Sequence, residues 1–297
     1  MSATELPSPL PEHLGGAIFF ALLMSFIVTW VAKRSGFYRL PPKKPPYPLP
    51  FWQTIGIFAV FLSISYLLLP LLTFALAYVK IGSITAIMSF SKVWLGWIQI
   101  VAFVILLVAL LLYCKCLNKE NTLEIFWGGK RKYYFSTALR DIGFGAMTWL
   151  VSYPIVVLTS LLAGFVSLQL WGVRGIEQLA VKQLLKFLDK PVLFVFLALS
   201  VVLLVPFMEE LLFRGFFQTW LKRYLNRGWA IVITSLLFSF VHFAPSQKIG
   251  NFELILSLFV LSCYLGFIYE RQRTIWAPVG LHLTFNGITI IGILFTQ

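Results

Sequence analysis

Charged residues are scarce in this chain of 297 residues, at 12% of the total, and acidic residues are the scarcest, with 11 Asp and Glu against 24 Lys and Arg. A typical soluble domain has about 25% charged and about 45–50% apolar residues, whereas 59% of this chain is hydrophobic. The shortage of charge excludes an ordinary soluble domain. It indicates an integral membrane protein with apolar runs long enough to cross the ~30 Å hydrocarbon core.

Cysteine is nearly absent as well. The three cysteines, Cys114, Cys116 and Cys263, are too few and odd in number for a disulfide framework.

Residues 1–14 lack the basic stretch that opens a secretory signal, so we expect the first apolar run to be a retained helix. The net charge of +13 lies mostly in short loops between apolar runs. We therefore expect anionic lipid headgroups as a partner and no nucleic acid.

Eight apolar runs predict an all-α polytopic transmembrane bundle of about eight helices. The sixth and seventh runs are shorter than the ~20 residues that a crossing normally needs. The eight runs are Gly15–Ala32, Ile55–Val79, Val93–Cys114, Ile142–Leu170, Pro191–Phe213, Trp229–Phe243, Leu254–Tyr269 and Trp276–Phe295.

The basic residues predict the orientation of this bundle. With eight spans, 17 of the 24 Lys and Arg fall on one side, in the segments Lys33–Lys44, Lys115–Arg140, Arg214–Arg227 and Arg271–Arg273. Basic residues accumulate on the cytoplasmic side of a membrane. We therefore expect these four segments in the cytoplasm and both termini outside it. Between spans four and five, residues Gly175–Lys190 predict an amphipathic helix on the membrane surface.

Two adjacent glutamates, Glu209 and Glu210, lie in a run that carries no other charge from Pro191 to Phe213. An ionised group near the bilayer centre costs about 2.5–3.5 kcal/mol on insertion scales, and two neighbouring carboxylates also repel each other. Ionisable residues in such places usually serve chemistry or ion handling. The glutamate pair is therefore the strongest functional signal in the sequence.

Two of the three histidines, His242 and His282, also lie in apolar runs. One buried histidine would more often be structural, but two beside a glutamate pair favour catalysis. If a helical hairpin turns near Asn226, Glu209 and His242 lie at similar depths, about 25 and 21 Å from the turn at ~1.5 Å per residue. Three pairs four residues apart share a helix face, namely Glu210 with Arg214, Phe238 with His242, and His282 with Asn286.

These motifs resemble those of the CAAX protease and bacteriocin-processing (CPBP) family, which includes the type II CAAX prenyl endopeptidases. The segments Glu209–Arg214 (EELLFR), Phe238–His242 (FSFVH) and His282–Asn286 (HLTFN) are similar to its EExxxR, FxxxH and HxxxN motifs. The motif EExxxR alone is weakly specific for this family, but the three motifs together, in this order, are strong evidence for the resemblance. The resemblance covers about Pro191–Phe295, and the first three spans match nothing that we can assign.

The resemblance implies an intramembrane glutamate-type endopeptidase. Glu209, with His242, would be the general base that activates a water for attack on a peptide carbonyl. His282 and Asn286 would donate hydrogen bonds to the developing oxyanion. The supporting residues would be Glu210, Arg214 and Phe238. Membrane-associated polypeptides are the expected substrates, either of the CAAX type or related to bacteriocin and peptide processing.

We accordingly expect residues 1–140 to form an N-terminal transmembrane region with an extended proline-rich linker at residues 41–50, and residues 141–297 to form the protease core, with its motifs within residues 191–295. The expected location is a bacterial inner membrane, with the active site facing the cytoplasm and the endoplasmic reticulum as the alternative. The sequence indicates neither an oligomeric state nor a prenylated substrate.

Three other interpretations stay open. A divalent metal such as zinc could bind glutamate and histidine, but the zinc motif HExxH is absent, so we expect no cofactor. Intramembrane Glu, His and Arg also form proton relays in transporters, although the inverted repeats common in transporters are not evident. A non-catalytic membrane scaffold would have no need of a glutamate pair in lipid.

Overall fold

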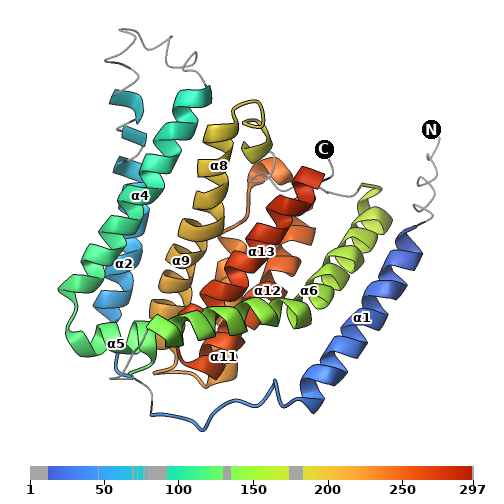
Figure 1. Cartoon of the computed structure of the whole chain (residues 1–297), viewed down its shortest axis with the longest axis horizontal. Helices are drawn as coiled ribbons and strands as arrows, with labels where there is room; N and C mark the ends of the chain where they lie inside the picture. The colour runs from blue at the N-terminus through green and yellow to red at the C-terminus, as the bar shows by residue number, and fades with distance from the viewer. Residues whose placement is uncertain are drawn as a thin grey trace, which may run out of the picture.

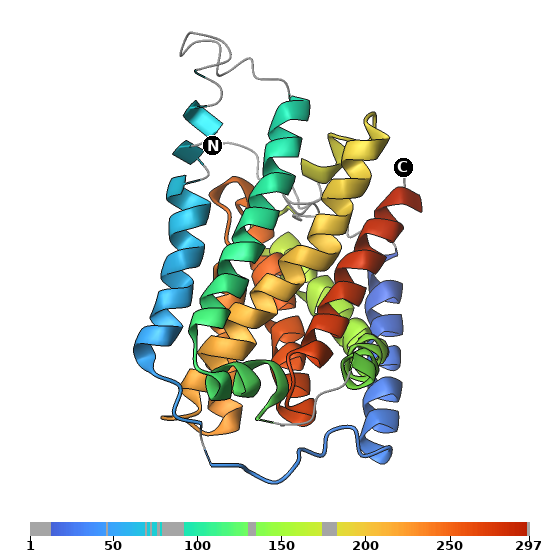
Figure 2. The same cartoon turned by 60° about the vertical axis from the view of Figure 1, so that its left-hand side comes forward.

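The computed structural model describes residues 13–45, 47–68, 70–71, 73–75, 78, 92–129, 135–173 and 183–295, and within these ranges every regular element is helical. The helices form a polytopic bundle, which confirms the predicted fold class (Figures 1 and 2). Half of the predicted surface helix at Gly175–Lys190, residues 175–182, lies outside the described residues, and in the other half residues 183–185 are helical and residues 186–189 form turns. The N-terminal elements are α1 (Leu14–Arg34), α2 (Phe51–Ser63), η1 (Ile64–Leu68), α4 (Lys92–Cys116), α5 (Lys119–Trp127) and α6 (Phe135–Trp171).

The C-terminal elements carry all three motifs. The motif EExxxR lies on a continuous helical segment, Pro191–Leu221, in which π-helical turns alternate with α-helix. The motif FxxxH lies at the end of α11, and HxxxN lies in α13. These elements are α8 (Pro191–Leu199), η3 (Ser200–Leu204), α9 (Val205–Glu210), η4 (Leu211–Gln218), α10 (Thr219–Leu221), α11 (Arg227–Phe240), η5 (Pro245–Gln247), α12 (Gly250–Gln272) and α13 (Trp276–Phe295).

Among the described residues, six helices are long and apolar enough to cross a membrane: Leu14–Arg34, Phe51–Ala75, Val93–Cys116, Phe135–Trp171, Pro191–Leu221 and Gly250–Gln272. The sixth predicted run is short as expected, because α11 has 14 residues, or about 21 Å at 1.5 Å per residue. The seventh run, Leu254–Tyr269, extends into the flanking sequence at both ends. Helix α12 has 23 residues because polar residues at its two ends, including Asn251 and Glu270, are helical and buried.

Helix α11 ends at Phe240, and this determines where His242 lies. The helix begins at Arg227, where the side chain of Asn226 accepts a hydrogen bond from the amide of Trp229 at 3.1 Å and caps the first turn. It ends at Phe240, and Val241 and His242 form the turn that follows. The motif histidine is therefore held at a helix C-terminus and not within a span.

Helix α13 packs directly against α6, which fixes the position of His282. A Cβ atom at Gly145 would lie 1.9 Å from the Ala277 carbonyl, and one at Gly280 would lie 2.1 Å from the Ile142 carbonyl. Small residues allow membrane helices to approach this closely. Asp141 follows Arg140 at a loop edge in the sequence, where a solvated carboxylate is expected, but the structure buries it. It is 2% exposed, and its carboxylate accepts a hydrogen bond from Thr274 Oγ1 at 2.9 Å, ahead of α13.

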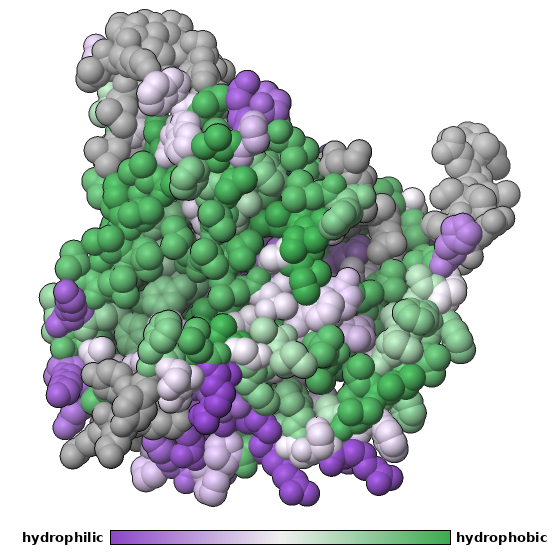
Figure 3. Space-filling model, in the orientation of Figure 1, coloured by the Kyte–Doolittle hydropathy of each residue, from purple (hydrophilic) through white to green (hydrophobic). Residues whose placement is uncertain are grey.

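The basic segments meet at one end of the bundle, the lower end in Figure 1. The proline-rich linker crosses this end, where Arg227 donates hydrogen bonds to the carbonyls of Pro41 and Pro42, and Arg223 to that of Leu49. Figure 3 shows hydrophilic residues gathered there below a broad hydrophobic surface. One residue of the predicted cytoplasmic set does not belong to it, because Arg214 is fully buried. Helix α1 begins and α13 ends at the opposite end (Figure 1).

Candidate active site

A proline shapes the helix that carries the two glutamates. Pro206 is the second residue of α9, which begins at Val205, and the π-helical turn η3 directly precedes this helix. In this wider register the amide of Val205 donates to the carbonyl of Ser200, five residues earlier. The next carbonyl in the same register belongs to Val201 and faces Pro206, which has no N–H to donate. The Val201 carbonyl is therefore left without a backbone donor.

Asn286 supplies the missing donor. Its Nδ2 atom donates a hydrogen bond to the Val201 carbonyl at 3.0 Å, from α13 to η3. The described contact of Asn286 is thus with the backbone of the glutamate helix, two turns before Glu209. An amide carries two N–H groups, so this contact engages half of its donor capacity. The expected role of Asn286 at the oxyanion stays a prediction.

Glu210 and Arg214 form the ion pair that their spacing predicts. Arg214 Nη1 lies 3.0 Å from Glu210 Oε1, and both side chains are fully buried. The other end of the guanidinium contacts α12, where Nη2 donates to Ser262 Oγ at 2.6 Å and to the Ser262 carbonyl at 3.2 Å. The guanidinium also lies over the ring of Phe238, 4.7 Å from its centroid. A buried ion pair of this kind needs such additional contacts to offset desolvation.

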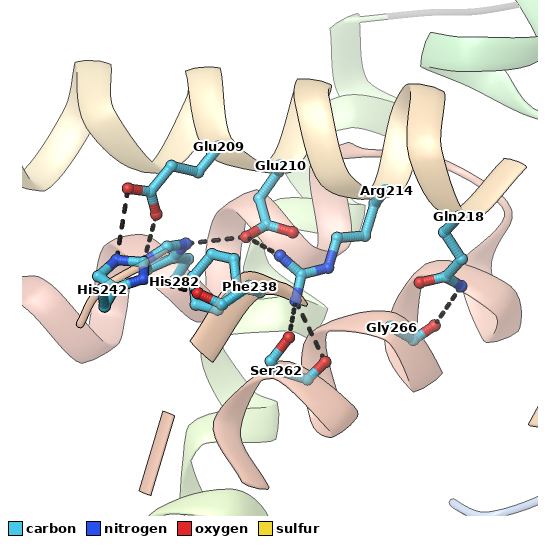
Figure 4. Close-up of polar contacts among 9 residues, drawn as sticks. All are labelled: Glu209, Glu210, Arg214, Gln218, Phe238, His242, Ser262, Gly266 and His282. Carbon is cyan, nitrogen blue, oxygen red and sulfur yellow. Dashed lines mark hydrogen bonds and ion pairs between the residues drawn. The ribbon is translucent and has the colours of Figure 1, made fainter. Parts of the chain in front are cut away.

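The same carboxylate orients His282. Glu210 Oε1 lies 2.8 Å from Nδ1 of His282, while the opposite nitrogen of the ring, Nε2, lies 3.7 Å from Oε2 of Glu209 (Figure 4). Since an ionised carboxylate can only accept, Nδ1 of His282 carries the hydrogen. Glu210 therefore holds the ring with Nε2 directed at Glu209.

His242 is oriented in the same way by a backbone group. Its Nδ1 lies 2.7 Å from the carbonyl of Phe238, which can only accept, so Nδ1 again carries the hydrogen. That carbonyl is one of those left unpaired at the end of α11. Nε2 of His242 then lies 3.7 Å from Oε1 of Glu209 (Figure 4). The two imidazoles thus present the same atom to opposite oxygens of one carboxylate.

The three side chains differ in exposure, which shows from which side the site opens. Exposed fractions are 18% for Glu209, 31% for His242 and 6% for His282. The residues next to His242, Val241 and Phe243, are apolar and more than half exposed. The site is therefore reached along the end of α11, past side chains that suit contact with lipid.

The structure also shows a polar ladder that the sequence analysis missed. Arg214 contacts Ser262, and one turn further Gln218 Nε2 donates to the Gly266 carbonyl at 3.2 Å (Figure 4). Gln218 Nε2 also donates to Glu270 Oε1 at 3.0 Å. The partners on each helix are four residues apart. That spacing of Ser262, Gly266 and Glu270 could have indicated a face of α12 that packs against the Glu210–Arg214 face.

The contact between Asn286 and Val201 predicts a specific double-mutant result. Asn286→Ala leaves a part-buried carbonyl unpaired, which should cost about 1–2 kcal/mol of unfolding free energy. Pro206→Ala restores a backbone N–H that can reach Val201, so Asn286→Ala should cost less than about 1 kcal/mol in that background. Unfolding of the four proteins in mixed micelles measures both costs. An equal cost in both backgrounds would contradict the contact.

Activity in the same four proteins separates the two roles of Asn286. If the asparagine acts only through the helix backbone, Pro206→Ala should restore activity along with stability. If it also donates to an oxyanion, the loss of turnover, about 10²–10³-fold for one such donor, should persist after stability is restored.

No group of three or more His, Cys, Asp and Glu side chains in the described part of the chain is arranged to hold a metal ion. Nε2 of His242 and Nε2 of His282 each lie 3.7 Å from an oxygen of Glu209, which is longer than a direct hydrogen bond. A water bound beside these atoms, and not on the line between them, could bridge the carboxylate and the imidazole nitrogens.

Comparison with known proteins gives two matches. Residues 191–288, which include all three motifs, match the family described as type II CAAX prenyl endopeptidase Rce1-like. Over 196 residues the chain is 23% identical to the protein named "Putative membrane peptidase YdiL" of Bacillus subtilis (strain 168), a match that covers 66% of this chain and 71% of that protein. No solved structure matches the chain.

Proposed function

Because the segment that holds the paired glutamates and both histidines belongs to the CPBP family, we propose that this multi-pass membrane protein is an intramembrane endopeptidase that hydrolyses peptide bonds with a water activated by Glu209. The observation that carries this proposal is the convergence of two Nε2 atoms on one carboxylate, each at 3.7 Å. A scaffold or a proton relay would not need both rings fixed in this orientation.

Glu209 is the general base in this proposal. It lies in a partly desolvated position next to the ion-paired Glu210. Its described partners on the facing elements are the imidazoles of His242 and His282. The water gives its proton to Glu209 as its oxygen attacks the carbonyl carbon. His242, with Nδ1 held by the Phe238 carbonyl, accepts a hydrogen bond through Nε2 and orients the water.

His282 stabilises the negative charge that forms on the carbonyl oxygen. Its Nδ1–H is directed at Glu210, so a donor at Nε2 requires the doubly protonated ring. Glu210 and Glu209 lie on the two sides of this ring, so each of its nitrogens has a carboxylate as a neighbour. The donor is then fixed in place before the charge develops.

The second half of the reaction returns the proton. When the tetrahedral intermediate collapses, the C–N bond breaks and the leaving amine takes the proton that Glu209 accepted from water. The products are a carboxylic acid and an amine, and Glu209 is ionised again. The acid then gives its proton to the amine, so a carboxylate and an ammonium group leave the site. No covalent intermediate with the protein forms, and no step uses a metal.

The surroundings of the site suggest the class of substrate. The opening beside His242 is bordered by exposed apolar side chains, so a substrate that lies in or on the membrane reaches it directly. We propose membrane-associated polypeptides, of the CAAX type or related to bacteriocin and peptide processing. The basic segments at one end of the bundle support a cytoplasmic orientation of that end. A bacterial inner membrane is the location that we propose.

New protein termini test the proposed activity. Membranes from cells that express the wild type or Glu209→Ala at matched levels are compared for peptide termini found in only one of them. Termini that require the wild type would give the substrate and the cleaved bond together. Identical termini, in cells with a phenotype that depends on this protein, would contradict proteolysis and favour a scaffold or transport role.

A chelator distinguishes water activation by Glu209 from metal-dependent hydrolysis. We expect EDTA or 1,10-phenanthroline to leave the activity of the purified protein unchanged, because the described side chains form no metal site. Activity that is lost on chelation and restored by zinc would overturn the metal-free mechanism while leaving the peptidase function intact.

A further inference from the structure

A cavity of about 250 Å³ lies at the basic end of the bundle, away from the candidate active site. It is bounded by the linker, the end of α5, the turn before α11 and the end of α12. Its volume far exceeds the about 10–15 Å³ that one water needs. Lys222, at its wall, follows Glu209 by 13 residues, or about 20 Å along a helix.

The walls of this cavity carry an excess of positive charge. The cationic side chains are Lys43, Lys44, Lys222, Arg227 and Arg273. Two carboxylates, Glu124 and Glu270, also line it. With all seven groups ionised, the lining carries three net positive charges. Like charges gathered around one cavity repel each other unless an anion lies between them.

This net charge already includes Glu270, whose carboxylate is paired with two of the cations. Its Oε1 atom lies 2.9 Å from Lys222 Nζ and its Oε2 atom lies 3.8 Å from Arg227 Nε. Lys44 donates to the carbonyl of Gly128 at 2.6 Å. For Lys43, which is exposed, the described residues provide neither a hydrogen bond nor an ion pair. Positive charge is thus left facing the cavity.

The backbone conformation of Arg273 also supports the conclusion that positive charge faces the cavity. Arg273 ends α12 in the left-handed region, with φ 59°, where glycine or asparagine is favoured and a long side chain is disfavoured. The arginine places a guanidinium in the cavity wall, where it also donates to the Pro42 carbonyl. A glycine would end the helix with less strain but would leave no cation there.

The level at which the cavity lies in the membrane indicates where an anion would come from. Two aromatic residues close to its wall in the sequence, Tyr224 and Trp229, are 64% and 59% exposed. Tyr and Trp gather at the level of lipid headgroups, and basic pockets between membrane helices on the cytoplasmic side suit phosphate-bearing headgroups. We infer that this cavity binds the phosphate group of an anionic phospholipid from the same leaflet.

Selective lipid retention tests the inference on the purified full chain. The protein is placed in nanodiscs of phosphatidylcholine and phosphatidylglycerol. After the protein is released from the nanodisc, native mass spectrometry counts how many molecules of each lipid are still bound to it. We expect phosphatidylglycerol to be enriched on the wild type. Lys43→Ala should lower the enrichment about fivefold, as expected for one cation near an anionic headgroup, and Lys43→Glu should lower it further.

Lys119→Ala is the matched control, because Lys119 is an exposed lysine at the same end of the bundle and lies outside the cavity lining. Equal retention by Lys43→Ala and Lys119→Ala, or no enrichment on the wild type, would overturn the inference. Equilibrium dialysis with inorganic phosphate distinguishes the source. Tight binding of free phosphate that abolishes lipid enrichment would contradict a lipid as the natural ligand.

Discussion

Glu209→Gln should lower peptide cleavage about 10²–10⁴-fold, the usual contribution of a general base, without unfolding the protein. Glutamine keeps the shape of the side chain but cannot accept the proton of the attacking water. Neither histidine depends on Glu209 for its orientation, because the Phe238 carbonyl holds His242 and Glu210 holds His282. Turnover is measured with a substrate found from the new termini, and folding by thermal unfolding in mixed micelles.

Glu120→Gln is the matched control for this substitution, since Glu120 is an exposed glutamate in α5 at the basic end of the bundle. It should behave as the wild type. His242→Ala should resemble Glu209→Gln in activity. Cleavage by Glu209→Gln near the wild-type rate would show that another group activates the nucleophile.

Arg214→Met should produce the largest loss of stability, about 3–5 kcal/mol, because it leaves the carboxylate of Glu210 charged and buried without a cation. Arg214 is fully buried and joins three elements, through Glu210 in α9, Phe238 in α11 and Ser262 in α12. Denaturant unfolding in mixed micelles gives the change in unfolding free energy.

A second substitution separates stability from catalysis. In the double variant Glu210→Leu/Arg214→Met no buried charge is left unpaired, so most of the lost stability should return. Activity should stay low, because His282 has then lost the carboxylate that fixes its Nδ1. Full activity in a stable double variant would contradict the role of Glu210 in orienting His282.

The parts of the site that the sequence predicts are those that depend on helix geometry. Spacing by four places Glu210 beside Arg214, and the structure confirms this pair at 3.0 Å. The similar depths of Glu209 and His242 also follow from a rise of ~1.5 Å per residue. The all-helical, multi-pass fold follows from apolar runs whose length is set by the bilayer.

The remaining features depend on which faces of the helices meet. Pro206 indicates a kink, but only packing determines that Asn286 supplies the donor that Val201 needs. Asp141 has the sequence surroundings of a loop edge, yet Thr274 and the close approach of α6 to α13 bury it. Helix α12 is longer than its apolar run because other helices cover its polar ends. Such contacts join residues distant in the chain and leave no local pattern.

The most direct test of the central claim is cleavage by the purified protein in proteoliposomes that contain a substrate identified from wild-type-dependent termini. We expect the wild type to cut the same bond as in cells, and Glu209→Gln, folded to the same extent, to leave it intact. Cleavage at the same bond by both proteins, or by neither, would contradict the proposal that Glu209 activates water for peptide hydrolysis in this membrane protein.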